Sequence, residues 1–222
     1  MKQYPVKEIF RTLQGEGAQY GTPSVFVRFG GCNLWSGFQE DRERDVARTG
    51  AACPLFCDTD FAKPDKLALE QIIEMMLGCG AAYVPLIVLT GGEPLLSVDA
   101  NLLNSIKRNF KNAKIAIETN GTVKLKEDYV PLIDWICVSP KLPVDQLVLT
   151  SGDELKVVFP AYNPLSYNSI TKNFTHNFVS PQASSGKRSV IDHDNVQKAV
   201  VFVSEHTKWR LSLQNHKILQ IP

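Results

Sequence analysis

The chain has 222 residues, of which 44% are hydrophobic and 21% charged, and its formal net charge is +1. This composition is typical of a soluble globular protein, and the nearly balanced charge gives no electrostatic reason to expect nucleic acid or an anionic membrane as the main partner. No apolar run approaches the roughly 18 residues that a membrane span needs, the first residues lack the apolar core of a signal peptide, and an odd number of cysteines, five, argues against a disulfide framework, so we expect a cytoplasmic protein with reduced thiols.

Short apolar stretches alternate with helical patterns along the chain. Residues 24–29 are β-branched and aromatic and end at two glycines, which predicts a strand. The wholly apolar residues 86–89 are typical of a strand buried in a parallel sheet. The polar residues 162–177 predict a loop. Further strands are expected at 114–117, 135–138, 154–159 and 209–213, and helices at 67–77, at 99–110, and at 193–206 with Val196, Val200 and Val203 facing inward.

Small and reactive residues follow the ends of these strands. In parallel β/α folds the carboxyl ends of the strands share one rim, where active sites are built. The strand ends in question are residues 30–32, 90–94, 118–121, 139–141, 180–182 and 214–217. The chain has too few residues and helices for a full eight-fold barrel. We therefore predict an α/β fold, a shortened or partial parallel β/α barrel that forms one domain over residues 1–222.

Three cysteines, Cys32, Cys53 and Cys57, are separated by twenty and three residues. An intracellular protein seldom places three thiols on one loop without a metal or redox purpose. Three thiolates on a four-iron cluster leave one iron open, since such clusters otherwise take four, whereas a structural zinc site needs a fourth protein ligand. An iron–sulfur cluster, zinc and unconnected thiols all stay open at this point.

The long first gap is an insertion at about residues 33–52, in which residues 38–48 are expected to form a short helix with a solvated charged face. Closing twenty residues rather than three costs about 1.7 kcal/mol of chain entropy. A metal site can return on the order of 10 kcal/mol of folding energy. The insertion is therefore compatible with a shared metal centre.

The stretch Thr90-Gly-Gly-Glu93-Pro94 follows the buried strand at 86–89. Glycines let a backbone approach a ligand closely, and Glu93 could accept a hydrogen bond from an ammonium group. The same letters also fit a tight turn with a helix-capping glutamate. Together with the cysteine triad, this stretch resembles the radical S-adenosylmethionine (SAM) enzymes.

Further motifs narrow the resemblance to the 7-carboxy-7-deazaguanine synthase family. They run over almost the whole chain: Phe10-Arg-Thr-Leu-Gln-Gly-Glu-Gly17, Arg28, Gly31-Cys-Asn-Leu-Trp35, Cys57-Asp-Thr59, Ser139-Pro-Lys141, Asp153-Glu-Leu-Lys-Val-Val158 and Trp209-Arg-Leu-Ser-Leu-Gln-Asn-His-Lys217. The resemblance implies a radical SAM lyase that converts 6-carboxy-5,6,7,8-tetrahydropterin to 7-carboxy-7-deazaguanine with release of ammonia, a step toward queuosine. It also implies a homodimer with a 4Fe–4S cluster, SAM and Mg²⁺, reduced by a donor such as flavodoxin.

The resemblance assigns a role to individual residues, none of them an acid–base catalyst, because the radical is generated at the cluster and SAM. The cluster ligands would be Cys32, Cys53 and Cys57, and Thr59 would offer its hydroxyl to Mg²⁺. SAM would contact Phe56, Cys57, Asp58, Gly92, Glu93, Ser139, Pro140, Lys141, Ser180 and Gln182. The pterin would contact Leu13, Gln14, Gly15, Glu16, Arg28, Thr90, His216 and, through its terminal carboxylate, Pro222.

Two other functions stay open on the sequence. Another radical SAM enzyme, such as a glycyl-radical activase, would need no pterin contacts. A zinc-stabilised binding module would use the three cysteines with one further ligand. Taken singly, Arg28 also fits a surface strand residue, His216 a loop histidine and Pro222 a frayed terminus.

Overall fold

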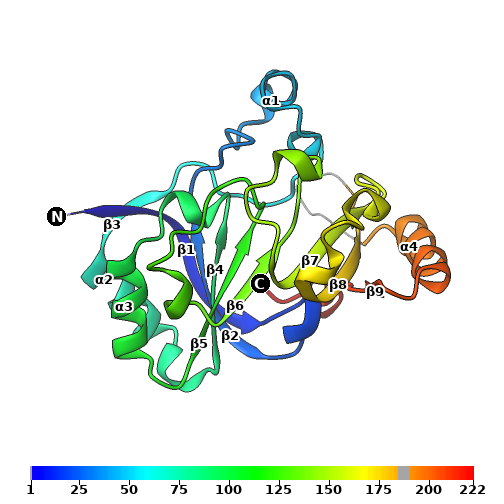
Figure 1. The fold of residues 1–222 in the computed structure, drawn as a ribbon. Helices are drawn as coiled ribbons and strands as arrows, with labels where there is room; N and C mark the ends of the chain where they lie inside the picture. Colours follow the sequence, from blue (N-terminus) through cyan, green and yellow to red (C-terminus); the bar gives the residue numbers. More distant parts are fainter. Residues whose placement is uncertain (1, 185–190) are drawn as a thin grey trace.

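The apolar stretches form one sheet of nine strands in the computed structural model, which describes residues 2–184 and 191–222 (Figure 1). The strand order is β3-β1-β2-β4-β5-β6-β7-β8-β9. The bounds are β1 Gln3–Leu13, β2 Pro23–Phe29, β3 Asp65–Ala68, β4 Leu86–Gly91, β5 Lys114–Thr119, β6 Trp135–Val138, β7 Gly152–Phe159, β8 Phe174–Pro181 and β9 Arg210–Leu211.

The seven strands from β2 to β9 in this order run parallel, whereas β1 pairs antiparallel with both β2 and β3. The strand β4 lies between β2 and β5. Its residues 86–89 are buried, as expected for a wholly apolar strand of a parallel sheet that is covered on both faces. The edges, β3 and β9, are four and two residues long. They do not pair with each other in the sheet of the described residues, so the barrel is partial.

Five α-helices are present in the described part of the chain, and they lie around the sheet (Figure 1). Their bounds are α1 Arg42–Thr49, α2 Leu69–Gly78, α3 Ala100–Asn109, α4 His193–Glu205 and α5 Asn215–Leu219. Figure 1 shows α2 and α3 together at one end of the sheet, α4 at the other end, and α1 on a projection above it. Across residues 2–184 and 191–222, no helix has the length and apolar character that crossing a membrane requires.

Helix α3 illustrates how the sequence determines an element. Asp99 caps it, because its carboxylate accepts a hydrogen bond from the Leu102 backbone N–H at 2.9 Å. Leu102, Leu103 and Ile106 are buried against the sheet, as the helical spacing predicts. The buried side chains of this half also come from α2 and β1, so the core lies between these helices and the first strands.

Three local expectations are wrong. In α4, Val200 is exposed and Ala199 is the buried residue, whereas Val196 and Val203 are half-buried and Val203 packs against the core as expected. Residues 174–177 belong to β8, since Phe174 pairs with Gly152 of β7. The last strand is confined to β9, and the antiparallel strands β1 and β3 were not anticipated.

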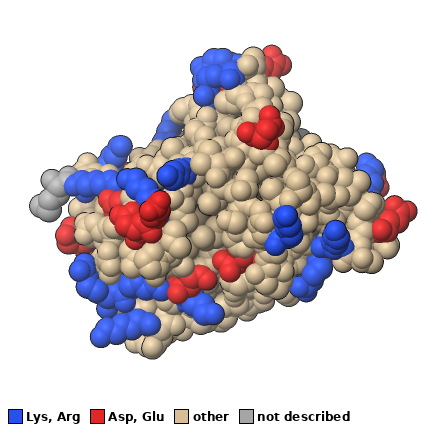
Figure 2. All heavy atoms as spheres, viewed as in Figure 1, with Lys and Arg blue, Asp and Glu red and all other residues tan. Residues whose placement is uncertain are grey.

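Figure 2 shows Lys and Arg side chains interspersed with Asp and Glu side chains around one face of the molecule. Much of the centre of that face carries neither sign. This distribution agrees with the net charge of +1 and gives this face no strong single-sign field.

Candidate active site

Two adjoining cavities lie at the carboxyl ends of the parallel strands, the edge of the sheet where such folds bind ligands. We call the larger, of about 360 Å³, the arginine cavity because Arg28 lines it. We call the smaller, of about 210 Å³, the thiol cavity because Cys53 and Cys57 line it. The residues that line both form their shared wall: Glu16, Asp58, Thr59, Thr90, Glu118 and Gln214.

The three-residue gap between Cys53 and Cys57 is one helical turn. Residues Cys53–Leu55 form a short 3₁₀ helix, and the Cys57 N–H donates to the Cys53 carbonyl at 2.8 Å. Residues four apart on such a turn lie on the same side of it, so both thiols face the same cavity. Cys32 lines neither cavity, but its sulfur accepts a hydrogen bond at 4.0 Å from the side-chain amide of Asn120, which lines the thiol cavity.

The insertion packs onto this cysteine turn. The Arg42 guanidinium stands over the Trp35 ring at 4.4 Å and donates to the backbone carbonyls of Pro54 and Cys57. Asp45 of α1 is buried and accepts a hydrogen bond from the Ser36 N–H at 2.7 Å. Arg42 and Asp45 of the predicted charged helix therefore bind other parts of the insertion and the cysteine turn, and only the remaining charged side chains are solvated.

The donor set fits an iron–sulfur cluster better than a single metal ion. In the described ranges no group of three or more His, Cys, Asp or Glu side chains is close enough to hold one ion. A four-iron cluster binds each thiolate through a different iron, so its ligand sulfurs lie further apart than those around one ion. Burial, reinforced by the neighbouring thiols, raises the pKa of Cys53 to about 12, and burial also raises the pKa of Cys32 and Cys57. Thiols in such a setting become ligands only when a metal displaces their protons.

The two glycines at the end of β4, Gly91 and Gly92, are required by close packing against the end of β2. A Cβ on Gly91, whose φ is +134°, would lie 2.1 Å from the Phe29 carbonyl oxygen. A Cβ on Gly92 would lie 2.1 Å from the Gly31 carbonyl oxygen. Only glycine permits these contacts. The glycines therefore bring the end of β4 against the start of the cysteine loop, and Gly92 lines the thiol cavity.

The Glu93 side chain is directed into the protein, because it is fully buried and lines neither cavity. Its carboxylate accepts hydrogen bonds from Leu95 N–H at 3.0 Å, Thr119 Oγ1 at 2.9 Å and Asn120 N–H at 2.8 Å. Burial raises its pKa in spite of these hydrogen bonds. The capping role suggested by the sequence describes this side chain, which fixes the ends of β4 and β5 relative to each other.

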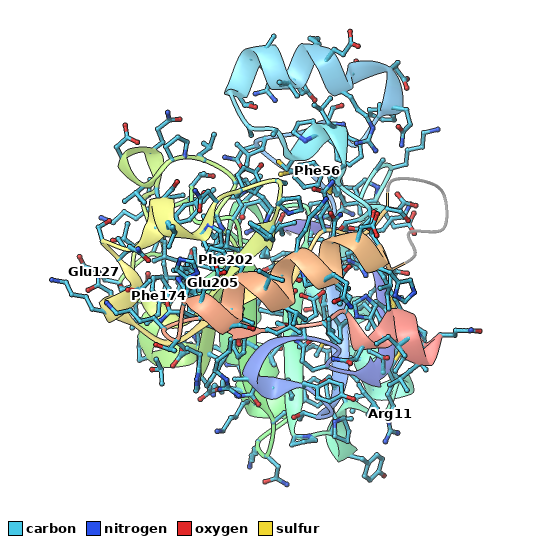
Figure 3. The ribbon with its side chains drawn as sticks, turned by 90° about the vertical axis from the view of Figure 1, so that its right-hand side faces the viewer. Arg11, Phe56, Glu127, Phe174, Phe202 and Glu205 are labelled. Carbon is cyan, nitrogen blue, oxygen red and sulfur yellow. The ribbon has the colours of Figure 1, made fainter. Side chains whose placement is uncertain are left out.

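Most residues predicted to contact SAM line the thiol cavity. Lys141 is held there by donating to the Ser139 carbonyl at 2.9 Å and to the Ser139 hydroxyl at 2.5 Å. Burial lowers its pKa. Pro140, like Glu93, does not line the cavity. The predicted residues that do are Phe56, Cys57, Asp58, Gly92, Ser139, Lys141, Ser180 and Gln182. In Figure 3, Phe56 lies on the same side of the molecule as α1, far from Arg11.

All eight residues predicted to contact the pterin line the arginine cavity, and Thr59 lies in the shared wall. They are Leu13, Gln14, Gly15, Glu16, Arg28, Thr90, His216 and Pro222. Arg28 donates through Nε to Glu8 Oε1 at 2.6 Å, and its guanidinium lies 5.6 Å from the Phe10 ring centre. Arg28 is therefore held in the cavity wall by a carboxylate and an aromatic ring.

The C-terminal segment forms part of the wall of the arginine cavity and packs on Gly15, which lies 200 positions before Asn215 in the chain. The Asn215 N–H and side-chain amide donate to the Gly15 carbonyl at 3.0 and 3.1 Å. A side chain on Gly15 would collide with His216, whose Nδ1 would lie 2.3 Å from the Cβ. Thr12 Oγ1 donates to a Pro222 oxygen at 2.8 Å. Burial lowers the pKa of His216, although the charge of Glu16 opposes this effect.

A buried lysine that was not anticipated, Lys156 of β7, lies in the wall of the thiol cavity. It forms an ion pair with Glu16 and lies 3.9 Å from Glu118. Glu118, the first residue of the strand end at 118–121, lines both cavities. The sequence signal that could have pointed to Lys156 is the pair of charged residues Glu154 and Lys156, at alternating positions of the predicted strand 154–159, whose other residues are apolar.

Comparison with known proteins finds close relatives along the full chain. No family model matches. Proteins named 7-carboxy-7-deazaguanine synthase from Nitratidesulfovibrio vulgaris and Burkholderia multivorans are each 42% identical to the chain, over 232 and 228 residues, and the alignments cover 99% of both partners. The crystal structure of QueE from Escherichia coli matches with a TM-score of 0.65 and 23% identity, covering 96% of this chain and 95% of that one. This solved structure has the same fold.

Proposed function

Because the chain belongs to the 7-carboxy-7-deazaguanine synthase family, we propose that it is a radical SAM lyase that converts 6-carboxy-5,6,7,8-tetrahydropterin to 7-carboxy-7-deazaguanine and ammonia. The observation that carries the proposal is the arginine cavity. All eight residues that the resemblance assigns to the pterin line it, although they come from segments spread over the whole chain. The cavity also shares a wall with the cavity that two of the cysteines line.

The thiol cavity would hold the cluster and SAM. Cys32, Cys53 and Cys57 would ligate three irons of a 4Fe–4S cluster, and the cluster with SAM would supply the radical chemistry when bound. The chain itself contributes a fixed lining, in which the cysteine turn is clamped by Arg42 and the lysine at 141 is held by Ser139. Such a lining orients a cofactor and excludes water from it.

The arginine cavity would hold the pterin. Arg28 uses only Nε toward Glu8, so its terminal nitrogens can pair with the substrate carboxylate. The 2-amino and N3–H edge of the pterin presents two parallel donors, which suits a carboxylate such as Glu16. Burial alone would raise the pKa of Glu16, but Lys156 and His216 outweigh it and lower the pKa to about 2. Glu16 is therefore an ionised acceptor at neutral pH.

Thr59 is the proposed contact for Mg²⁺, because it lies in the shared wall next to two carboxylates, Asp58 and Asp60. Hard oxygen donors of this kind suit a hard cation. The homodimer, an electron donor such as flavodoxin, the cytoplasmic location and the single-domain organisation are further proposals, which rest on membership of the family.

The test is one reaction with anaerobically reconstituted protein. The protein is incubated with SAM, a chemical reductant, Mg²⁺ and 6-carboxy-5,6,7,8-tetrahydropterin, and the deazapurine is followed by chromatography and mass spectrometry. Formation of 7-carboxy-7-deazaguanine with one ammonia per product is the expected result. Cleavage of SAM without a deazapurine would instead indicate a different radical SAM enzyme, such as a glycyl-radical activase. A colourless protein loaded with zinc would indicate a binding module.

A further inference from the structure

Lys156 lies where the two cavities meet, and it is almost completely buried on β7. Its ammonium group contacts Glu16 Oε2 and lies 3.9 Å from Glu118 Oε1. Both glutamates belong to the shared wall. One cation therefore lies between two carboxylates, each on a different strand or loop.

Neutral side chains donate further hydrogen bonds to the same two carboxylates. Gln214 Nε2 donates to Glu16 Oε1 at 3.0 Å. Gln14 Nε2 donates to Glu118 Oε1 and Thr90 Oγ1 donates to Glu118 Oε2, both at 3.1 Å. The group of two carboxylates and one ammonium carries a net charge of −1. Such a wall favours a ligand edge that offers N–H donors and disfavours an anionic edge.

The other charged groups near the arginine cavity have partners of their own. Arg28 is paired with Glu8, and Lys217 is paired with Asp58 at 2.5 Å. Neither can replace Lys156 as the counter-charge of Glu16 without breaking its own pair. The titratable groups that act on Lys156 or Glu16 are Glu118 from β5, Cys137 from β6, Glu154 from β7, Lys141 from the loop after β6 and His216 from α5.

We propose that Lys156 is a positioning residue that holds the Glu16 and Glu118 carboxylates in place as hydrogen-bond acceptors, so that the arginine cavity selects ligands with two adjacent N–H donors; this inference rests on the proposed function. Without the ammonium, the two half-buried carboxylates would repel each other, which would favour the protonated form of Glu16. A protonated carboxyl presents a donor where the ligand also presents a donor. The ligand would then lose an acceptor and meet an unfavourable contact.

The pKa directions agree with this geometry. Burial favours the neutral form of Lys156, but Glu16 and Glu118 outweigh it and raise its pKa well above the usual value. Glu16 moves in the opposite direction, toward the carboxylate. Both members of the pair are therefore held in their charged forms.

The test measures binding without turnover. Reconstituted protein loaded with SAM, but without reductant, is titrated with 6-carboxy-5,6,7,8-tetrahydropterin by anaerobic calorimetry between pH 5 and pH 8. Lys156→Met is expected to bind at least tenfold more weakly, with affinity that falls toward pH 5 more steeply than that of the wild type. Lys156→Arg keeps the cation and should restore most of the affinity. Lys114→Met, at the exposed far end of β5, is the matched control and should bind like the wild type.

A double variant separates positioning from general damage to the fold. In a Glu16→Gln background, Lys156→Met should weaken binding less than threefold, because its main target is already neutral. If Lys156→Met does not fold, Lys156→Gln removes the charge while keeping a donor and allows the same comparison. If Lys156→Met or Lys156→Gln binds the pterin with wild-type affinity and with the wild-type pH profile, the inference is overturned and the proposed function stands. Failure of the wild type itself to bind the pterin would overturn the proposed substrate, and the inference with it.

Discussion

The two cavities differ in how they treat their ionisable groups. At the shared wall, the half-buried Glu16 and the buried Lys156, which lines the thiol cavity, are each shifted toward the charged form because the other lies beside it. In the thiol cavity, burial shifts Cys53 toward the neutral thiol and Lys141 toward the neutral amine. Buried groups stay charged only where the protein supplies the opposite charge. The charges at the shared wall are therefore balanced within the chain, whereas a metal centre would supply the positive charge that the thiols lack.

The largest effect that tests this difference is expected for the cysteines. Cys53→Ser should abolish cluster assembly and reduce deazapurine formation by about 10³-fold or more, since the radical chemistry supplies most of the rate enhancement. Iron content, visible absorbance and product formation are the measurements. Cys79→Ser is the control, because its thiol lies near the Ile9 carbonyl and lines neither cavity. A Cys53→Ser protein with full iron content would show that this thiol is not a ligand.

Arg28 tests the substrate side. Arg28→Ala removes a charge-assisted contact worth about 1.5–3 kcal/mol, so kcat/KM for the pterin should fall roughly 10- to 150-fold. The cluster content and the cleavage of SAM should stay at the wild-type level. Arg11→Ala provides the control, since Arg11 is on the neighbouring strand β1 but outside both cavities and on the far side of the molecule from Phe56 (Figure 3). Equal losses in the two variants would exclude Arg28 from the substrate site.

The sequence was sufficient to predict most of the parallel sheet, because the apolar strands and the helix cap at Asp99 are local signals. The inward face of α4 was only partly predictable, since Val196 and Val203 are half-buried as expected, but Ala199 and not Val200 is buried between them. Which residue packs inward depends on contacts with β8 and β9 that no local pattern contains. The edge strand β3 is only four residues long and shows no alternation of burial.

The residues of the candidate site were likewise only partly predictable from the sequence. Residues that follow a strand, such as Thr90 and Ser139, were predictable because the carboxyl ends of parallel strands share one edge. Residues 214–217 were also expected at this edge, but the resemblance to a family was needed to assign His216 to the pterin, and it reaches the cavity from α5, which packs on Gly15. Lys156 was missed because its role depends on Glu16, 140 residues earlier in the chain. Glu93 has the predicted position but directs its carboxylate into the protein.

Acid titration sharpens the comparison at Glu16, whose pKa is lowered from 4.5 to about 2. A lowered pKa stabilises the folded state above the unfolded value and loses this contribution as the pH falls toward the folded value. Between pH 4.5 and 2 the wild type should therefore lose on the order of 2 kcal/mol of unfolding free energy that Glu16→Gln never had. Chemical denaturation at several pH values measures this difference. A wild type that is equally stable from pH 5 to pH 2.5 would contradict the assignment.

The smallest effect concerns two buried tyrosines near the thiol cavity. The Tyr167 hydroxyl donates to the Leu142 carbonyl at 3.0 Å, so Tyr167→Phe leaves that carbonyl unpaired and should lower the unfolding free energy by about 1 kcal/mol. The Tyr162 hydroxyl is buried without a hydrogen-bond partner among the residues that the structure describes, and the adjacent Cys53 thiol is only a weak acceptor.

Tyr162→Phe removes a polar group whose burial is uncompensated while the ring keeps its edge contact with Phe56, at 6.0 Å between ring centres. The cluster-free protein should therefore be unchanged or up to about 1 kcal/mol more stable. The two variants delete the same atom from the same residue type, so chemical denaturation compares them directly. If Tyr162→Phe loses as much stability as Tyr167→Phe, the Tyr162 hydroxyl beside Cys53 already has a hydrogen-bond partner in the cluster-free protein. The polar groups of the thiol cavity would then be paired within the chain, as those of the shared wall are.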